Sequence, residues 1–539
     1  MTDDSKTDTS LHRPEVLEAW QRLNHLKQTQ HPIPDSQSVP RIHVGSLTAD
    51  FSRQRVDGEI VQALHDLAEQ SDMSTAIQRQ FRGDPVNVTE ARPVLHTALR
   101  APYETCPASI RDEVRQERDK LIDFARRLRS GAWRGYTGKA IECLVHIGIG
   151  GSNLGPECAW EALKDMNDSG IECRFLASID PRQLDRTLKN LDAETTLFVV
   201  VSKSFGTLET RSNADAVRSW FLERSGSLSA MHQHFVAVTS HPERAQEFGI
   251  SADNLFAMWD WVGGRFSLWS SVGLPLAVML GETAYRSLLA GACTLDQHVS
   301  NTPVAQNLPV WLALLAVWNS NFLGTESHAV LAYDHRLKLL PAHLQQVEME
   351  SLGKSVHNDG TPCSIATGCI LWGGEEPQGQ HAYHQLLHQG TRQFSADFIA
   401  CATSAGDHPE QHVWLLANCL SQGQALYQGQ PLDPLRQDPL APHKFLPGKH
   451  PSTTLLLSEL TPEALGELLA LYEHKVMCLG ILLDINAWDQ WGVELGKTLA
   501  RQIHQNLVGV SVSHSSTAQQ EPLSADTILA VSAASQDKG

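Results

Sequence analysis

The sequence predicts an α/β protein built on mainly parallel sheets, and three observations support this class. The chain has 539 residues, which is too long for one ordinary core, so two or more domains are expected. Short apolar runs alternate with helical patterns, as they do in βαβ units. Two of these runs lead into loops rich in glycine or hydroxyl side chains, and parallel sheets bind ligands at such loops.

Strand-like and helix-like segments follow one another in a regular order along the chain. The first hundred or so residues are expected to be helical and irregular, with a helix that begins at Pro14. Strands are then expected over residues 143–147, 173–177, 197–201, 234–238 and 254–258. After a helical stretch from about Pro275 to Phe322, a second α/β unit is expected from strand-like runs over residues 328–332, 369–372 and 397–401. Residues 514–539 are expected to form a loosely ordered tail.

The composition is typical of a soluble cytoplasmic protein. The formal charge is −18, which disfavours nucleic acid and anionic membranes as partners. Ten cysteines without a CxxC pair indicate reduced thiols in a cytosol. The polar, acidic start of the chain has no signal-peptide pattern, and the longest apolar stretch, Leu308–Trp318, is too short to span a bilayer.

A loop with four hydroxyl groups follows the apolar run 197–200. Residues 201–210 read V-S-K-S-F-G-T-L-E-T, and a helix is expected to begin within them. Unpaired N–H groups and the helix dipole favour an anion at such a position. Hydroxyl donors and one cation add to this tendency, and they come from Ser202, Ser204, Thr207, Thr210 and Lys203. The loop therefore predicts a site for a small phosphate ester, with a purely structural helix cap as the alternative.

A glycine-rich loop, G-I-G-G-S-N-L-G-P over residues 148–156, follows the first predicted strand. Its glycines permit close approach of a ligand to the backbone, and Ser152 can donate a hydrogen bond. Asn153 occupies the sixth position, where a dinucleotide-binding loop has glycine. Residues 492–498 resemble a P-loop superficially, but the spacing between their glycines is too short and no strand precedes them. One phosphosugar-sized pocket is therefore favoured over a nucleotide site.

Two further segments offer groups for proton transfer. On a helix, Gln346 and Glu350 would share a face, and a carboxylate there can act as a general base. A solvated surface charge is the alternative for Glu350. Residues 263–267, G-G-R-F-S, present Arg265 from a glycine turn, where it could stabilise an oxyanion or form an ordinary ion pair.

His381, His384 and His388 lie at helical spacing, so a metal site is conceivable. They lack the H-E-x-x-H arrangement and a cysteine cluster, so an acid–base histidine or simple packing is favoured. No metal and no cofactor are expected.

Eight segments, taken in order, resemble the glucose-6-phosphate isomerase family. They are VLHTALR at 94–100, GIGGSNLGP at 148–156, SKSFGTLET at 202–210, GGRFS at 263–267, QQVEMES at 345–351, GQHAYHQLLHQGT at 379–391, YEHK at 472–475 and AWDQWGVELGK at 487–497. The resemblance covers nearly the whole chain except for about the last two dozen residues. Each segment is weak evidence alone, but the ordered set is specific.

The resemblance implies an aldose–ketose isomerase that interconverts D-glucose 6-phosphate and D-fructose 6-phosphate through a cis-enediol(ate), in glycolysis and gluconeogenesis. It also implies two sugar-isomerase-type α/β domains with parallel sheets flanked by helices, and a homodimer whose active site lies between the subunits. The expected boundaries are 1–120 for a helical N-terminal segment, 121–290 for the first domain, 291–513 for the second domain with C-terminal helices, and 514–539 for the tail.

By the same resemblance, Glu350 is the base and Arg265 lies beside the intermediate. His381, supplied by the partner subunit, and Lys497 open the sugar ring. The expected phosphate-binding residues are Ser152, Ser202, Lys203, Ser204 and Thr207. The expected further residues of the pocket are Gly151, Glu209, Gln346 and Gln490.

The chain departs from the family's usual pattern at several positions. Val347 stands where the family usually has glycine, Gly206 removes one hydroxyl, Trp488 replaces Phe or Tyr, and the loop before His381 is a variant. Two alternatives are a phosphosugar sensor that has lost catalysis and a related isomerase or aminotransferring enzyme on the same domains. Retention of the proposed catalytic side chains disfavours the sensor, and the segment at 487–497 disfavours the related enzyme.

Overall fold

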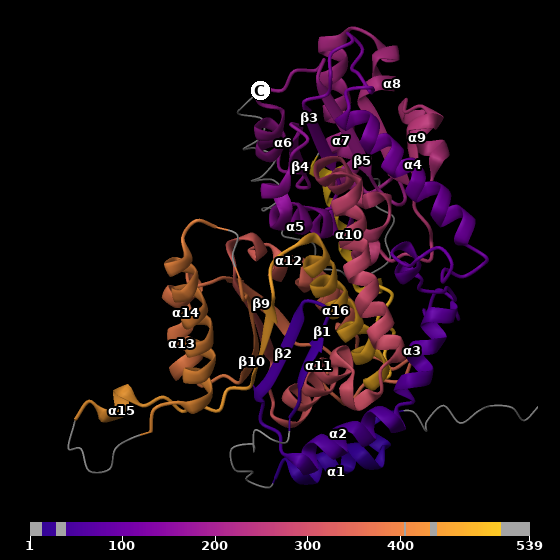
Figure 1. Cartoon of the computed structure of the whole chain (residues 1–539). Helices are drawn as coiled ribbons and strands as arrows, with labels where there is room; N and C mark the ends of the chain where they lie inside the picture. The colour runs from indigo at the N-terminus through magenta and orange to yellow at the C-terminus, as the bar shows by residue number, and fades with distance from the viewer. Residues whose placement is uncertain (1–12, 29–38, 404–405, 432–438, 508–539) are drawn as a thin grey trace, which may run out of the picture. The chain divides into compact units, whose positions relative to one another are not determined.

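The computed structural model describes residues 13–28, 39–403, 406–431 and 439–507 (Figure 1). The chain forms two compact units, of which the first runs to Trp488 and the second begins at Asp489. The predicted tail, residues 514–539, lies outside the described residues.

The first sheet is fully parallel and has the strand order β4-β3-β5-β6-β7. Its strands are β3 (Cys143–Ile147), β4 (Glu172–Leu176), β5 (Thr196–Val201), β6 (Phe235–Thr239) and β7 (Leu255–Ala257). All five lie within two residues of the predicted segments. The central strands are buried on both faces, so their sequences read as continuous apolar runs.

Helices separate these strands along the chain, as βαβ connections require. They are α5 (Leu154–Leu163), α6 (Pro181–Leu188), α7 (Leu208–Ser225), α8 (Met231–His234) and α9 (Pro242–Phe248). One face of the sheet packs against apolar side chains of α7 and α9, among them Val217, Phe221 and Phe248. The other face belongs to the main core of the first unit.

The second sheet has six strands in the order β1-β2-β11-β10-β8-β9. The strands are β1 (Arg41–Val44), β2 (Leu47–Arg53), β8 (Ser327–Tyr333), β9 (Ile370–Glu375), β10 (Phe394–Cys401) and β11 (Ser452–Leu457). The last four pair in parallel, while β1 and β2 form an antiparallel hairpin at one edge. The two observed sheets confirm the predicted α/β class.

The prediction that the N-terminal segment is helical and irregular is wrong for the hairpin β1–β2, and the prediction omitted β11. The strand signal in β2 was present, because Leu47, Ala49 and Phe51 are buried while the residues between them are partly exposed. This period of two is easily overlooked in seven residues. The hairpin needs β11, four hundred residues away, to cover one edge.

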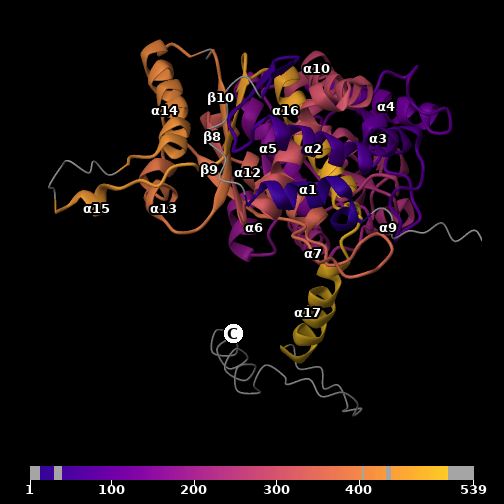
Figure 2. The same ribbon diagram turned by 90° about the horizontal axis from the view of Figure 1, so that it is seen from below.

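Three helices fill the space between the inner faces of the two sheets: α10 (Leu274–Asn301), α11 (Leu308–Val317) and α16 (Pro462–Leu482). Figure 1 shows α10 and α16 side by side at the centre of the first unit. Figure 2 shows α13 (His384–Gln389) and α14 (Pro409–Gln428) on one side of β8, β9 and β10. The remaining helices are α1 (Glu18–Leu26), α2 (Gly58–Gln70), α3 (Met73–Arg82), α4 (Arg111–Arg129), α12 (Leu340–Gln345), α15 (Ala441–Lys444) and, in the second unit, α17 (Glu494–Leu507).

The described part of the chain contains no helix that is long and apolar enough to cross a membrane. The apolar stretch that begins at Leu308 forms the buried helix α11, in agreement with the prediction. All ten cysteines are free thiols, as their spacing predicted.

Candidate active site

The predicted site loops meet at the carboxyl ends of β3 and β5. These strands are neighbours, and the chain leaves β3 towards β4 on one side and later returns to β5 on the other. The loops after such a pair diverge and leave a crevice for ligands. The glycine loop forms the short helix η4 (Gly150–Ser152) after β3, and the hydroxyl loop 202–207 follows β5.

The short helix η8 (Gly264–Trp269) packs directly on η4 and brings Arg265 to the site. No side chain fits at Gly151, because a Cβ atom there would overlap the Gly264 carbonyl group and lie 2.6 Å from the Arg265 amide nitrogen. Ser267 Oγ donates to the Gly264 carbonyl oxygen at 2.7 Å, which tightens the same turn. The glycine loop therefore sets the position of the Arg265 backbone.

Replacing Gly151 by Ala is expected to lower kcat strongly, because the added methyl group must push η4 and η8 apart and displace Arg265. We expect a loss of roughly a hundredfold, measured as steady-state sugar-phosphate turnover. The matched control is Gly58→Ala, where a Cβ meets no atom within 4 Å. Similar kcat values for the two variants would show that the close approach at Gly151 is unimportant.

Glu350 and Arg265 form the centre of the site. Arg265 Nη1 donates to Glu350 Oε1 at 2.9 Å, and Gln346 Nε2 donates to Glu350 Oε2 at 3.0 Å. The Glu350 side chain is 25% exposed, whereas that of Arg265 is completely buried. A carboxylate with both oxygens oriented by neighbours, yet reachable from outside, can accept a proton from a bound substrate. The solvated-charge alternative for Glu350 is not supported.

The guanidinium of Arg265 is held on each of its nitrogen atoms. Nε donates to Ser351 Oγ at 2.6 Å, and Nη2 donates to the Ala487 carbonyl oxygen at 2.6 Å. A planar fork with fixed partners loses little orientation when charge develops nearby. Arg265 is therefore a rigid positive charge directly behind Glu350.

The predicted common face of Gln346 and Glu350 is confirmed, although the turn that carries them is π-helical. This turn, η13 (Gln346–Glu350), continues α12 and widens the helix at the site. Gln346 also lies near the glycine loop, since a Cβ at Gly150 would be 3.2 Å from Gln346 Nε2. Val347, the departure beside the base, is fully buried in the main core and so faces away from Glu350.

The hydroxyl loop does not act as a helix cap. Thr207 is the N-cap residue of α7, but its side chain makes no capping hydrogen bond and instead accepts one from Ser202 Oγ at 3.3 Å. Ser202 is buried, and the buried Thr210 Oγ has no hydrogen-bond partner. The alternative of a purely structural cap is therefore weakened for Thr207, whose half-buried side chain lies at the start of α7, where an anion is favoured.

Lys203 lies in the same loop, but its ammonium group contacts the turn at 260–262. Nζ is 3.3 Å from the carbonyl oxygens of Asp260 and Val262 and 3.4 Å from Asp260 Oδ1. Burial lowers the pKa of the Lys203 ammonium from its ordinary value, and the charge of Asp260 opposes that effect. Its side chain thus joins the loop after β5 to the turn that leads into η8. Its main-chain N–H remains a candidate phosphate donor.

Replacing Thr207 by Val is expected to raise KM for a sugar phosphate about tenfold, because a hydrogen bond to a charged group contributes about 1.5–3 kcal/mol. The melting temperature should change little, since no cap is lost. The matched control is Thr461→Val on α16, where the Thr461 hydroxyl does cap the helix by accepting from the Ala464 amide at 3.1 Å. That variant should lose stability and keep its KM. If Thr207→Val instead lost stability and kept its KM, Thr207 would have a structural role.

The three histidines at helical spacing do not converge on one point. His381 is exposed on η14 (Gly379–His381), whereas His384 and His388 both contact Gln422 Oε1, at 3.2 Å and 3.0 Å. His384 Nε2 also lies 3.2 Å from Glu376 Oε1. Within the described ranges, no cluster of three or more His, Cys, Asp or Glu side chains is arranged to hold a metal ion. The metal interpretation of this segment receives no support from the geometry.

The other predicted site residues have distinct locations. Glu209 lies in the first turn of α7 and is half-buried, Ser152 ends η4 and is half-buried, and Ser204 is exposed. Gln490 and Lys497 lie in the second unit, where Lys497 Nζ pairs with Glu494 Oε1 at 2.7 Å on α17. Their place at the site remains a prediction.

Two residues beside the site were not predicted individually. His96 is buried and stacks on Phe266, the residue after Arg265, with ring centroids 4.8 Å apart. Ser351 binds the Arg265 guanidinium. Both lie in segments already identified by resemblance, but nothing in the local pattern indicated which partner they contact.

Known proteins match this arrangement along almost the whole chain. The family model described as phosphoglucose isomerase matches residues 50–520. The chain belongs to the phosphoglucose isomerase family. It is similar to the glucose-6-phosphate isomerase of Pseudomonas fluorescens strain Pf0-1, with 46% identity over 92% of this chain and 94% of the relative. The predicted family and the predicted aldose–ketose isomerase class are confirmed.

Two further matches support membership of the phosphoglucose isomerase family. The glucose-6-phosphate isomerase of Ectopseudomonas mendocina is 47% identical over 88% of this chain and 89% of the relative. A solved glucose-6-phosphate isomerase from Chlamydia trachomatis superposes with a TM-score of 0.80 and 33% identity, covering 92% of this chain and 96% of that one. The similarity therefore extends through both sheets and the helices between them.

Proposed function

We propose that the chain interconverts D-glucose 6-phosphate and D-fructose 6-phosphate through a cis-enediol(ate). The observation that carries the proposal is the Glu350 carboxylate, which is oriented by Arg265 and Gln346 and still 25% exposed. Gln346 and Arg265 in turn touch the two adjacent glycines of η4, so the base and the glycine loop form one site.

Glu350 is the base in this proposal. It removes the proton from carbon 2 of the open-chain aldose, the electron pair forms the double bond between carbons 1 and 2, and negative charge moves to the oxygen on carbon 1. The proton of the hydroxyl group on carbon 2 passes to the oxygen on carbon 1, and Glu350 returns its proton to carbon 1 while the oxygen on carbon 2 becomes the carbonyl. Atoms and electrons balance within the substrate, and the chemistry needs only a base, a charge partner and a ring-opening acid.

Arg265 is the charge partner in the proposal. Its guanidinium is fixed before the reaction begins, so it can stabilise the enediolate without reorganising. The hydroxyl groups of the loop 202–207 bind the phosphate, together with Ser152 and main-chain N–H groups. This remote binding energy orients the reacting end of the sugar. Glu209 and Gln490 complete the pocket.

Ring opening requires an acid and a base at the other end of the site, and we assign these roles to His381 and Lys497. His381 is exposed on η14, and in the described part of the chain no hydrogen bond or ion pair joins it to Glu350 or Arg265. Its exposure suits a residue that serves the site of a second copy in a homodimer. Two sugar-isomerase domains over residues 121–290 and 291–513, cytoplasmic location and a role in glycolysis and gluconeogenesis belong to the same proposal.

The test is turnover of fructose 6-phosphate by chelator-treated protein, with the product glucose 6-phosphate coupled to a dehydrogenase. Robust turnover that does not change with chelator is expected. Sugar-phosphate binding without turnover would favour the sensor alternative instead. A subunit-mixing experiment tests the dimer: two separately inactive variants, His381→Ala and Glu350→Gln, should regain part of their activity when co-expressed.

A further inference from the structure

Helix α16 contains four consecutive polar residues that are all buried. Tyr472, Glu473, His474 and Lys475 have exposed fractions of 1%, 2%, 0% and 2%, although the rest of the helix is largely apolar. Buried polar side chains are expensive unless each has a partner. Such a run in the middle of a core helix therefore requires a structural or functional reason.

Each of the four side chains reaches a different element, because successive residues of a helix point in different directions. Tyr472 Oη donates to Asp397 Oδ2 on β10 at 2.9 Å, Trp269 Nε1 on η8 donates to Glu473 Oε1 at 2.8 Å, His474 Nε2 lies 2.7 Å from Asp296 Oδ1 on α10, and Lys475 Nζ donates to Glu348 Oε2 on η13 at 2.9 Å. Glu473 Oε2 also accepts from Arg100 Nη1 at 2.5 Å. Two of these elements, η8 and η13, carry Arg265 and Glu350.

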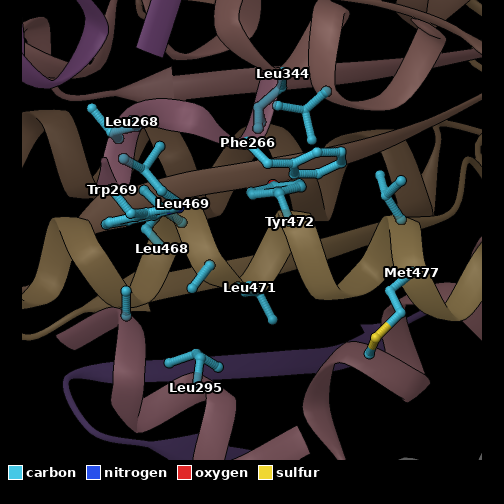
Figure 3. Close-up of a cluster of buried hydrophobic side chains, with 14 of the residues drawn as sticks. Phe266, Leu268, Trp269, Leu295, Leu344, Leu468, Leu469, Leu471, Tyr472 and Met477 are labelled. Atoms are coloured by element: carbon cyan, nitrogen blue, oxygen red, sulfur yellow. The ribbon is translucent and has the colours of Figure 1, made fainter. Parts of the chain in front are cut away.

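Apolar side chains also join η8 to α16. Figure 3 shows Phe266, Leu268 and Trp269 of η8 packed beside α16, in the cluster that includes Tyr472. Trp269 ends the short helix in which Arg265 is the second residue, and its ring also lies under Arg100, 4.6 Å from the guanidinium carbon. The hydrogen bond from Trp269 and the apolar packing around it thus hold η8 against α16.

The contact between Lys475 and Glu348 joins the turn η13, which carries Glu350, to α16. Glu348 precedes Glu350 by two residues, and residues at that spacing do not face each other on a helical turn. Glu348 is buried against α16, while Glu350 faces the site. Burial acts to lower the pKa of the Lys475 ammonium, but Glu348 and Asp397 outweigh that effect, and the pKa lies above its ordinary value. Lys475 therefore remains charged and bound to Glu348.

We propose that Lys475 is a positioning residue for Glu350, acting through the buried Lys475–Glu348 ion pair that fixes the π-helical turn η13 on α16. The proposal rests on the role assigned to Glu350 above. Glu350 has few restraints of its own, namely Arg265, Gln346 and a bond from Lys354 Nζ to its main-chain oxygen at 2.8 Å. A wide π-helical turn without an anchor would allow its carboxylate to shift against Arg265, and small displacements of a reacting group are costly.

A purely structural ion pair is the competing explanation, and two variants separate the explanations. In Lys475→Met, Glu348 is left buried without its partner, so stability and kcat should both fall. In the double variant Lys475→Met with Glu348→Met, both charges are gone, and a buried pair replaced by apolar side chains of similar volume usually recovers stability. The positioning role predicts that kcat stays low in the double variant even though the melting temperature recovers.

The expected result is a kcat at least about tenfold below wild type in both variants, with KM for fructose 6-phosphate within about threefold, since the phosphate loop is untouched. Tyr472→Phe is the matched control on the same helix. It removes a buried hydrogen bond to Asp397 but touches neither η8 nor η13 through a hydrogen bond, so it should lower the melting temperature and leave kcat unchanged.

Recovery of kcat together with stability in the double variant would overturn the proposal, as would a wild-type kcat in Lys475→Met. If Lys475→Met does not fold, the double variant alone decides between the two explanations. Glu350→Gln is measured in parallel: if that variant remains active, the assigned base is wrong, whereas an inactive Glu350→Gln beside a fully active double variant refutes the positioning role alone.

Discussion

Replacing Glu350 by Gln is expected to lower kcat by roughly a thousandfold or more, because an amide cannot take a proton from carbon. The shape of the site should survive. Arg265 Nη1 can donate to the new amide oxygen, and Gln346 can turn its own amide, since Gln346 Oε1 has no hydrogen-bond partner in the present arrangement. The measurement is steady-state turnover in both directions, combined with binding of a sugar-phosphate competitor.

Glu282→Gln is the matched control for this prediction. Glu282 is also a carboxylate between cationic side chains, with Arg126 at 3.0 Å and Arg286 at 2.9 Å, but it lies on the exposed side of α10. Loss of this charge should leave kcat unchanged. Turnover by Glu350→Gln within about tenfold of wild type would refute the role of Glu350 as the base.

Replacing Arg265 by Lys should lower kcat roughly a hundredfold, although the positive charge is kept, because removal of one fixed electrostatic donor typically has an effect of that size. A hundredfold loss corresponds to about 2.7 kcal/mol of transition-state stabilisation. One ammonium group cannot reach Ser351 Oγ, Glu350 Oε1 and the Ala487 carbonyl oxygen together. The same loss leaves buried acceptors without donors, so stability should also decrease.

Two measurements separate catalysis from stability in Arg265→Lys. Kinetics are recorded well below the melting temperature of the variant, and competitor binding is measured at the same temperature. We expect intact binding with a reduced kcat. The control is Ser351→Ala, which removes only the acceptor of Arg265 Nε and should cost a few-fold at most, since the contacts to Glu350 and Ala487 persist. A near-normal kcat in Arg265→Lys would mean that charge alone suffices.

Much of the fold was predictable because apolar runs in parallel strands are continuous and local. The strands from Cys143 and Thr196 were found to within a residue, since both are buried on each face. The hairpin of Arg41–Val44 and Leu47–Arg53 and the strand Ser452–Leu457 were not found. The hairpin joins the sheet through β11, four hundred residues away, and β11 also pairs with β10. The local alternation in Leu47–Arg53 does not reveal that distant partner.

Some features of the candidate site were also predictable from the sequence, and others were not. Residue types and spacing identified the glycine loop, the hydroxyl loop, Arg265 and Glu350, because proton transfer and phosphate binding demand those groups. The sequence could not indicate that Thr207 leaves its helix uncapped, or that Lys203 turns towards Asp260. Such choices depend on which neighbours compete for each hydrogen bond.

By itself, the sequence determined the α/β class, the family and the set of groups available for chemistry. These depend on periodicity and on side-chain identity, and both can be read from each residue and its neighbours in the chain. Only the tertiary structure decided that Gly151 admits no side chain beside Gly264, that Arg265 is enclosed behind Glu350, and that Lys475 on α16 binds the turn carrying the base. The physical reason is that burial and distance arise between segments far apart in the chain, where packing selects one partner among many chemically equivalent ones.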